Sequence, residues 1–249
     1  LHGVLISPVA PAVTDIAAVE LIVGFSLLLG FLITPSLLII IGFYLAGLIH
    51  NGYMFGSLEV LAAAISLFLL ADNRPSFDNI VGIPMLFRNR LAKYVPIILR
   101  IGVGATFIFL AFYEKIFNPH FFSTVVQSFN LTSIIPVSSA MWTLSVGLIE
   151  LLVGIFIIFG FKTRITSAIA FCVFITTFFF FKESVFSHVS IFAGLSALFI
   201  LGGGIYSIDE YIENTKKTTK TKATTLRKPA KRKTRKKTIA RKSTNKSLQ

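Results

Sequence analysis

Seven runs of apolar side chains fill most of the first 205 residues, and they limit what this chain can fold into. A helix that crosses a bilayer core needs about 20 apolar residues, with about 17 as the lower limit. Backbone groups in lipid have no water to bond, so each run is expected to form a helix. Hydrophobic residues make up 54% of the chain and charged residues 14%, so we predict an all-α, polytopic membrane helix bundle. The runs are 16–33, 36–49, 57–71, 95–113, 140–161, 165–181 and 189–205.

Positive charge is concentrated at the C-terminal end. The net charge is +13, but 15 of the 24 Lys and Arg follow Ile212, and residues 1–211 carry nine basic and ten acidic side chains. The low-complexity segment 212–249 is therefore predicted to be a disordered basic tail. Such a tail attracts anionic lipid headgroups, by about 1 kcal/mol for each basic residue near the surface. Nucleic acid is the less favoured partner, because no aromatic residue stands between the charges to stack on bases.

The distribution of Lys and Arg also predicts an orientation. When the seven helices are threaded alternately through the membrane, the tail, the linker 79–94 and the turn with Lys162 and Arg164 fall on one side. The positive-inside rule makes that side the cytoplasm. We therefore expect a multi-pass protein of the cell membrane with a cytoplasmic tail.

The segment 114–139 then lies on the outer side. Phenylalanine and valine recur at helical spacing over 119–129, after Asn118 as a possible cap and Pro119 in the first turn. This pattern predicts a short helix on the membrane interface. Asn130 begins a glycosylation sequon on the side where it could be used.

The sequence contains an internal repeat. The segment 18–31 aligns without gaps with 148–161 at an offset of 130, with six identities in fourteen positions. A looser similarity pairs 66–78 with 197–209 at an offset of 131. We interpret the chain as two tandem copies of one helical unit.

The second copy has four apolar runs and the first copy has three. We therefore expect two four-helix units, the first of which lacks its first helix in this chain, with that helix encoded upstream. The alternative is a seven-helix protein whose first copy lost a helix. The expected divisions are a first unit at 1–78, a cytoplasmic linker at 79–94, a second unit at 95–211 and the tail at 212–249.

Each copy has one carboxylate within its aligned run, Glu150 in "GLIELLVGIFIIFGF" and Glu20 at the corresponding position. Gly147 and Gly154 share a helical face with Glu150, and such small residues let another helix approach closely. A charged side chain at the centre of a membrane helix costs about 2.5 to 3.5 kcal/mol. Both glutamates should therefore face the bundle interior, paired or neutralised. Depth estimates make a Glu150–Arg100 ion pair feasible.

The second unit resembles the DoxX-like family of four-helix membrane proteins. The resemblance rests on "LRIGVGATFIFLAFYEKIFNPHFF", on "GLIELLVGIFIIFGFKTRITSAIAF" and on His188 at the start of a fourth helix. It covers about 95–206 well and 1–78 more weakly, and it implies a membrane partner in quinone-linked redox metabolism. The duplication and the basic tail depart from the family pattern. The matching positions are Glu114, Lys115, Pro119, Glu150, Gly154, Gly160, Thr163 and Arg164.

Two functions fit these residues. An intramembrane ionisable group is typical of a proton, quinone or substrate path, so the protein could be a subunit of a quinone-linked oxidoreductase. The alternative is a non-enzymatic scaffold or anchoring subunit, with the glutamates as clamps between helices and Arg100 snorkelling to the cytoplasmic headgroups. The catalytic candidates are Glu150, Glu20, Arg100 and His188, and the quinone-binding candidates are Glu114 and Lys115.

The sequence offers no redox group of its own. Cys172 is its one cysteine, so no intrachain disulfide forms, and no cluster has metal-ligand spacing. We therefore predict no metal and no intrinsic cofactor, with quinone as the bound group. A partner redox protein is expected to hold the catalytic centre.

Overall fold

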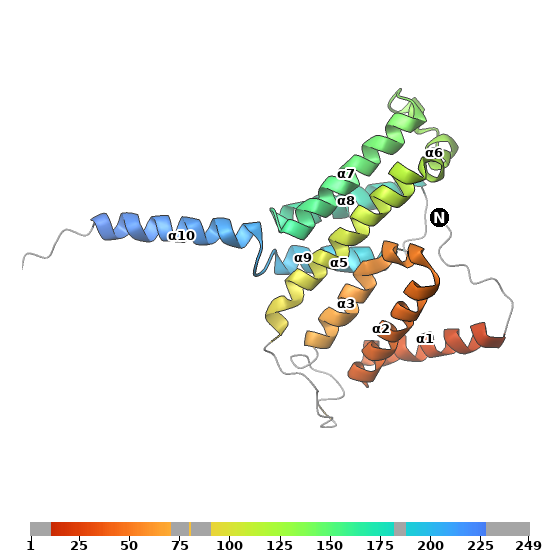
Figure 1. Cartoon of the computed structure of the whole chain (residues 1–249), viewed down its shortest axis with the longest axis horizontal. Coiled ribbons are helices and arrows are strands. Elements are labelled where there is room, and N and C mark those ends of the chain that lie inside the picture. Colours follow the sequence, from red (N-terminus) through yellow and green to blue (C-terminus); the bar gives the residue numbers. More distant parts are fainter. Residues whose placement is uncertain (1–10, 71–79, 81–90, 182–187, 228–249) are drawn as a thin grey trace, which may run out of the picture. The chain divides into compact units, whose positions relative to one another are not determined.

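The computed structural model describes residues 11–70, 80, 91–181 and 188–227, and these residues form helices joined by short turns (Figure 1). No strand occurs in this described part of the chain, so the all-α prediction is confirmed. The linker predicted at 79–94 lies mostly outside the described residues.

The helices follow the predicted apolar runs closely. The first part of the chain forms α1 (Pro11–Leu29), α2 (Ile33–His50), a 3-10 helix (Gly52–Ser57) and α3 (Leu58–Leu70). The second part forms α5 (Val95–Leu110), a π-helix (Ala111–Phe117), α6 (Pro119–Ser128), α7 (Ser139–Phe159), α8 (Thr163–Phe181), α9 (Val189–Leu201) and α10 (Ile208–Arg227). Short 3-10 helices lie at Ala92–Tyr94 and Leu131–Ser133.

Several of these helices can span a membrane. Among the described residues, four are long and apolar enough to cross one: Ile33–His50, Gly52–Leu70, Ala92–Phe117 and Ser139–Phe159. Three further helices contain shorter apolar segments: Ala18–Leu29 of α1, Thr163–Thr176 of α8 and Val189–Leu201 of α9. Many of their large apolar side chains are exposed, as a surface facing lipid requires.

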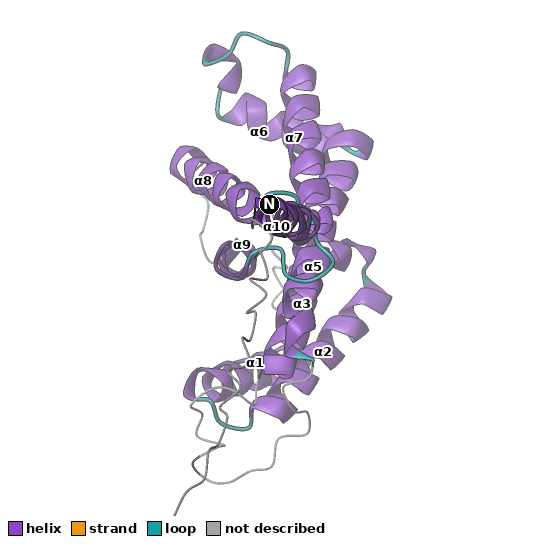
Figure 2. Cartoon of the chain, turned by 90° about the vertical axis from the view of Figure 1, so that its left-hand side faces the viewer, coloured by secondary structure: helices purple, strands orange, loops and turns teal. Residues whose placement is uncertain are grey.

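The core is built around α5. This helix packs against α3, α7 and α9, and Figure 2 shows α8 and α9 on one side of it and α2 on the other. Glycines bring the backbones together: a Cβ at Gly102 would overlap Ala62 of α3, and one at Gly104 would lie 2.8 Å from the Gly154 carbonyl oxygen of α7. Such close contacts are the usual way in which membrane helices associate. The core cluster consists of Val95, Leu99, Val103, Phe107, Ile157, Ala170, Ile191, Leu195 and Leu198.

The turns after α1 and α7 share one backbone geometry. Gly30 and Gly160 have φ values of 67° and 66°, and Leu32 and Lys162, two residues later, have 48° and 45°. In both turns the residue after the glycine donates its N–H to the carbonyl five residues earlier, at 2.8 and 2.9 Å. Gly30 and Gly160 are 130 residues apart in the chain, and so are Leu32 and Lys162, which is the offset of the sequence repeat. The duplication itself stays a prediction.

The segment expected to be a disordered tail begins as a helix. The Ser207 hydroxyl accepts a hydrogen bond from the Glu210 N–H at 3.0 Å, which caps the start of α10. Glu213 and Lys217 then form an i,i+4 ion pair at 2.7 Å, which lowers the pKa of the exposed Glu213. The Ser207 cap and the Glu213–Lys217 ion pair support a helix that continues to Arg227. This helix includes the first part of the segment 212–249, which was predicted to be disordered. Residues 228–249 lie outside the described residues.

Candidate functional site

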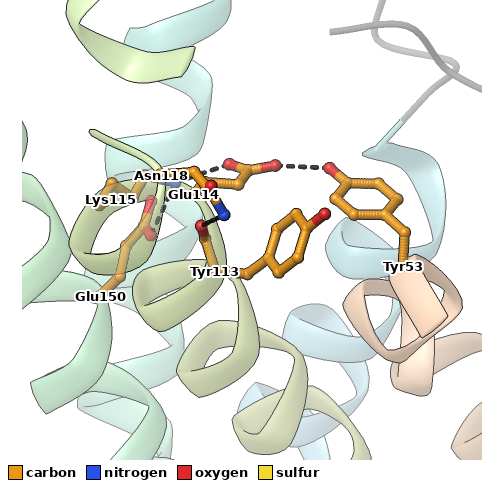
Figure 3. A network of polar contacts seen from close by, with 6 residues as sticks. All are labelled: Tyr53, Tyr113, Glu114, Lys115, Asn118 and Glu150. Carbon is orange, nitrogen blue, oxygen red and sulfur yellow. Dashed lines mark hydrogen bonds and ion pairs between the residues drawn. The ribbon is translucent and has the colours of Figure 1, made fainter. Parts of the chain in front are cut away.

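A π-helix at Ala111–Phe117 continues α5 and carries two charged side chains, Glu114 and Lys115. The π-helix is rare, and it often marks functional sites. Asn118 ends it by donating from Nδ2 to the Tyr113 carbonyl oxygen at 2.9 Å (Figure 3). Asn118 therefore closes the π-helix and does not cap α6 with its side chain, although α6 begins at Pro119 as predicted.

The Lys115 ammonium lies between two carboxylates. Its Nζ is 3.0 Å from Glu114 Oε2 and 2.9 Å from Glu150 Oε2, and only 6% of the side chain is exposed (Figure 3). Gly147 of α7 makes room for it, because a Cβ there would lie 2.8 Å from the Lys115 Cβ. The ring of Phe122 of α6 covers Nζ, with its centroid 5.4 Å away. Two carboxylates therefore share one ammonium in this network.

Tyr53, in the 3-10 helix before α3, links the first part of the chain to this network. Its hydroxyl donates to Glu114 Oε1 at 2.5 Å. Its ring packs edge-on against Tyr113, with centroids 5.4 Å apart, and Tyr113 stacks on Phe109 at 5.3 Å. Glu114 thus accepts from a phenol on one side and an ammonium on the other, next to a wall of aromatic rings.

One oxygen of the network is short of a donor. The contact between Lys115 Nζ and Glu150 Oε2 is an ion pair that lacks hydrogen-bond geometry, and this buried oxygen has no other hydrogen-bond donor in the described part of the chain. An acceptor left without a donor in a buried site is costly. Glu150 Oε2 is therefore placed to accept a hydrogen bond or a proton from a bound group.

The feasible Glu150–Arg100 pair does not form. Arg100 is 2% exposed, and its Nη2 donates to the carbonyl oxygens of Ile205 and Tyr206 at 3.2 and 3.3 Å. The segment after α9 reaches α5 at this level and supplies those carbonyls, while Glu150 finds its cation on the π-helix. Nor does Arg100 snorkel to water, because its side chain is buried.

Two further catalytic candidates, Glu20 and His188, lie on α1 and just before α9. Glu20 is exposed on α1, which packs against α2, and Gly24 one turn later has no atom within 4 Å of a Cβ position. The expectation that both glutamates face the interior is therefore wrong for Glu20, because none of the described helices packs on its face of α1 as α5 packs on α7. His188 precedes α9 and lies next to Phe174 of α8, with ring centroids 6.2 Å apart.

Two polar residues that join helices were missed from the sequence, the buried Glu59 and the exposed Tyr53. Glu59 of α3 is 3% exposed and bonds to hydroxyls of α5 and α9. It is the one charged residue of its apolar run, the same signal that singled out Glu150. Tyr53 stands in a polar turn, where no sequence pattern indicates its role. No group of three metal-binding side chains occurs among the residues that the structure describes.

Comparison with known proteins bears on the second part of the chain. The family model described as DoxX matches residues 95–183, a segment that includes the π-helix and α7. No curated protein and no solved structure matches the chain. The matched segment and the apolar helices agree with the resemblance inferred from sequence. The chain is therefore an integral membrane protein in which residues 95–183 match the DoxX family model.

Proposed function

We propose that the protein is a membrane subunit of a quinone-linked redox system and that the network of Tyr53, Glu114, Lys115 and Glu150 binds the polar head group of a quinone. The observation that carries this proposal is the buried Lys115 ammonium held between two carboxylates, 3.0 and 2.9 Å away. Ionisable residues inside membrane segments are costly, and they commonly mark proton or substrate paths.

The chemistry of the site suits a quinone. Reduction of a quinone consumes two electrons and two protons and gives a quinol with two hydroxyl groups. The Lys115 ammonium has three hydrogens and so keeps a donor for a quinone carbonyl, and Glu150 Oε2 is an acceptor for a quinol hydroxyl. The aromatic rings of Tyr53 and Tyr113 offer faces for a flat head group. The electrons come from a partner redox protein, since the sequence holds a single cysteine.

A scaffold is the second candidate function, favoured by one observation. Gly147 fits so closely against Lys115 that the network also clamps α7 to the π-helix. In a scaffold the same ions would fix the packing and take up no ligand.

The remaining expectations about the protein belong to the same proposal. The protein lies in the cell membrane with α10 and the basic tail in the cytoplasm, where Lys and Arg bind anionic headgroups. Nucleic acid is the alternative partner for the tail. The first unit is a second, diverged copy of the DoxX-like unit, and the matching turns after α1 and α7 support this duplication.

Turnover of the partner redox complex distinguishes the quinone-binding function from the scaffold function. Glu150→Gln keeps the shape and a hydrogen-bonding amide but removes the titratable group. Quinone reduction by membranes with this variant should fall at least about tenfold at matched protein level. Glu20→Gln is the matched control, because Glu20 also lies in an apolar helix but outside the network. Normal turnover in Glu150→Gln would leave the scaffold as the function.

A further inference from the structure

A second buried carboxylate lies between three helices and takes no part in the network above. Glu59 lies in the candidate span Gly52–Leu70 and is 3% exposed. Its Oε2 accepts from Thr106 Oγ1 of α5 at 2.6 Å, and its Oε1 accepts from Ser190 Oγ of α9 at 2.9 Å. Both of these donors are neutral hydroxyl groups.

The direction of one hydrogen bond is fixed. Thr106 Oγ1 also accepts the backbone N–H of Glu59, at 3.1 Å, so its one hydrogen is committed to the carboxylate. A 2.6 Å contact from a hydroxyl lies in the range of bonds to an ionised oxygen. Thr106 itself is fully buried. The site is therefore built to hold Glu59 in one position.

The charge state of Glu59 is set by opposing effects. Burial in a membrane segment disfavours a carboxylate, whereas two hydroxyl donors favour it. The titratable groups that act on Glu59 from the surrounding described elements are His188, just before α9, and Tyr44 of α2. Glu150 differs, because the Lys115 ammonium is within ion-pair distance of it. The donors bonded to the Glu59 carboxylate are two hydroxyl groups, and both are uncharged.

We propose that Glu59 binds and releases a proton within the bundle and that His188 exchanges this proton with the membrane surface. In the uptake step the imidazolium of His188 loses an N–H bond, and a Glu59 oxygen gains an O–H bond. Both groups are then neutral, so no net charge stays in the membrane segment. Imidazole is well suited to such transfer. This site works without a quinone and stands on residues outside the quinone network.

The test is infrared difference spectroscopy of the purified full chain in lipid nanodiscs during a pH titration. A carboxylic acid C=O band should appear and disappear with pH. Glu59→Gln should abolish it, and Glu20→Gln should leave it in place. Loss of one hydroxyl donor in Ser190→Ala should move its midpoint by about one unit to higher pH, a tenfold change in proton affinity. Thr106→Ser keeps both bonds and should leave the midpoint unchanged.

The role of His188 has its own readout. After a pH jump, His188→Gln should take up the Glu59 proton about tenfold more slowly, or slower still. An equal rate in this variant would overturn the assignment of His188.

The proton site itself is overturned by any of three results. The first is a Glu59 C=O band that stays constant over the whole pH range in which the protein is stable. The second is a band whose pH midpoint changes with sodium concentration. The third is a pH midpoint that is the same in Ser190→Ala as in the wild type. If Glu59→Gln does not fold, the Ser190→Ala and Thr106→Ser pair still decides the question, since both retain the carboxylate.

Discussion

Lys115→Met removes the ammonium from between two carboxylates, and we expect it to be among the most damaging single changes in the chain. At 2.9 to 3.0 Å and an effective dielectric constant of about 20, each pair attracts by about 5 to 6 kcal/mol before desolvation is subtracted. Desolvation of the three ions costs several kcal/mol each. The network as a whole is therefore worth little, whereas loss of one partner strands two negative charges at a cost of about 3 to 5 kcal/mol.

The double variant Lys115→Met with Glu150→Met is the matched control. Replacing a buried ion pair with apolar side chains of similar volume is often neutral. Glu114 loses its ammonium but keeps the Tyr53 donor in the double variant, so part of the lost stability should return. The measurement is the free energy of unfolding in mild detergent, followed by loss of helical circular dichroism. A loss below about 1 kcal/mol in Lys115→Met, or no recovery in the double variant, would show that Lys115 is not the counter-ion that the structure indicates.

Three further predictions concern single contacts, all measured as unfolding free energies in the same detergent. Tyr53→Phe removes a donor to the Glu114 carboxylate and should cost about 1.5 to 3 kcal/mol; an unchanged value would mean that this bond does not form. Gly147→Ala forces a methyl group against the Lys115 Cβ and should cost about 1 to 3 kcal/mol, with a similar effect in the Lys115→Met background, because methionine keeps that Cβ. Ser207→Ala removes the cap of α10 and should cost about 1 kcal/mol, with loss of helix confined to that segment.

The fold was largely predictable because an apolar run in lipid must satisfy its own backbone hydrogen bonds and therefore forms a helix. The seven runs became helices, and α6 began at Pro119, where the sequence placed it. Several boundaries moved by a few residues, since glycines with positive φ at Gly30, Gly160 and Gly202 end α1, α7 and α9 before the apolar run does. The helix in Ile208–Arg227 was missed because composition indicates disorder, whereas a hydroxyl cap and one i,i+4 ion pair act locally.

The site was predictable in its residues but not in its pairing. Glu150 was a catalytic candidate, Glu114 and Lys115 were quinone-binding candidates, and the structure joins the three. The depth estimate made Arg100 a feasible ion-pair partner of Glu150, but this pair does not form. Depth along the membrane normal says nothing about which backbone carbonyl groups lie against an arginine side chain. The π-helix places Lys115 against α7, and its wider turn depends on packing that no local sequence pattern encodes.

Bound quinone is the most direct test of the central claim. The protein is purified in mild detergent from quinone-containing membranes, extracted with organic solvent, and analysed for quinone per mole of protein. The wild type and Glu20→Gln should retain quinone close to one per chain. Lys115→Met with Glu150→Met, which removes the ammonium and the Glu150 carboxylate from the network, should retain little. Equal quinone in all three proteins, or none in any, would contradict the account and favour a scaffold.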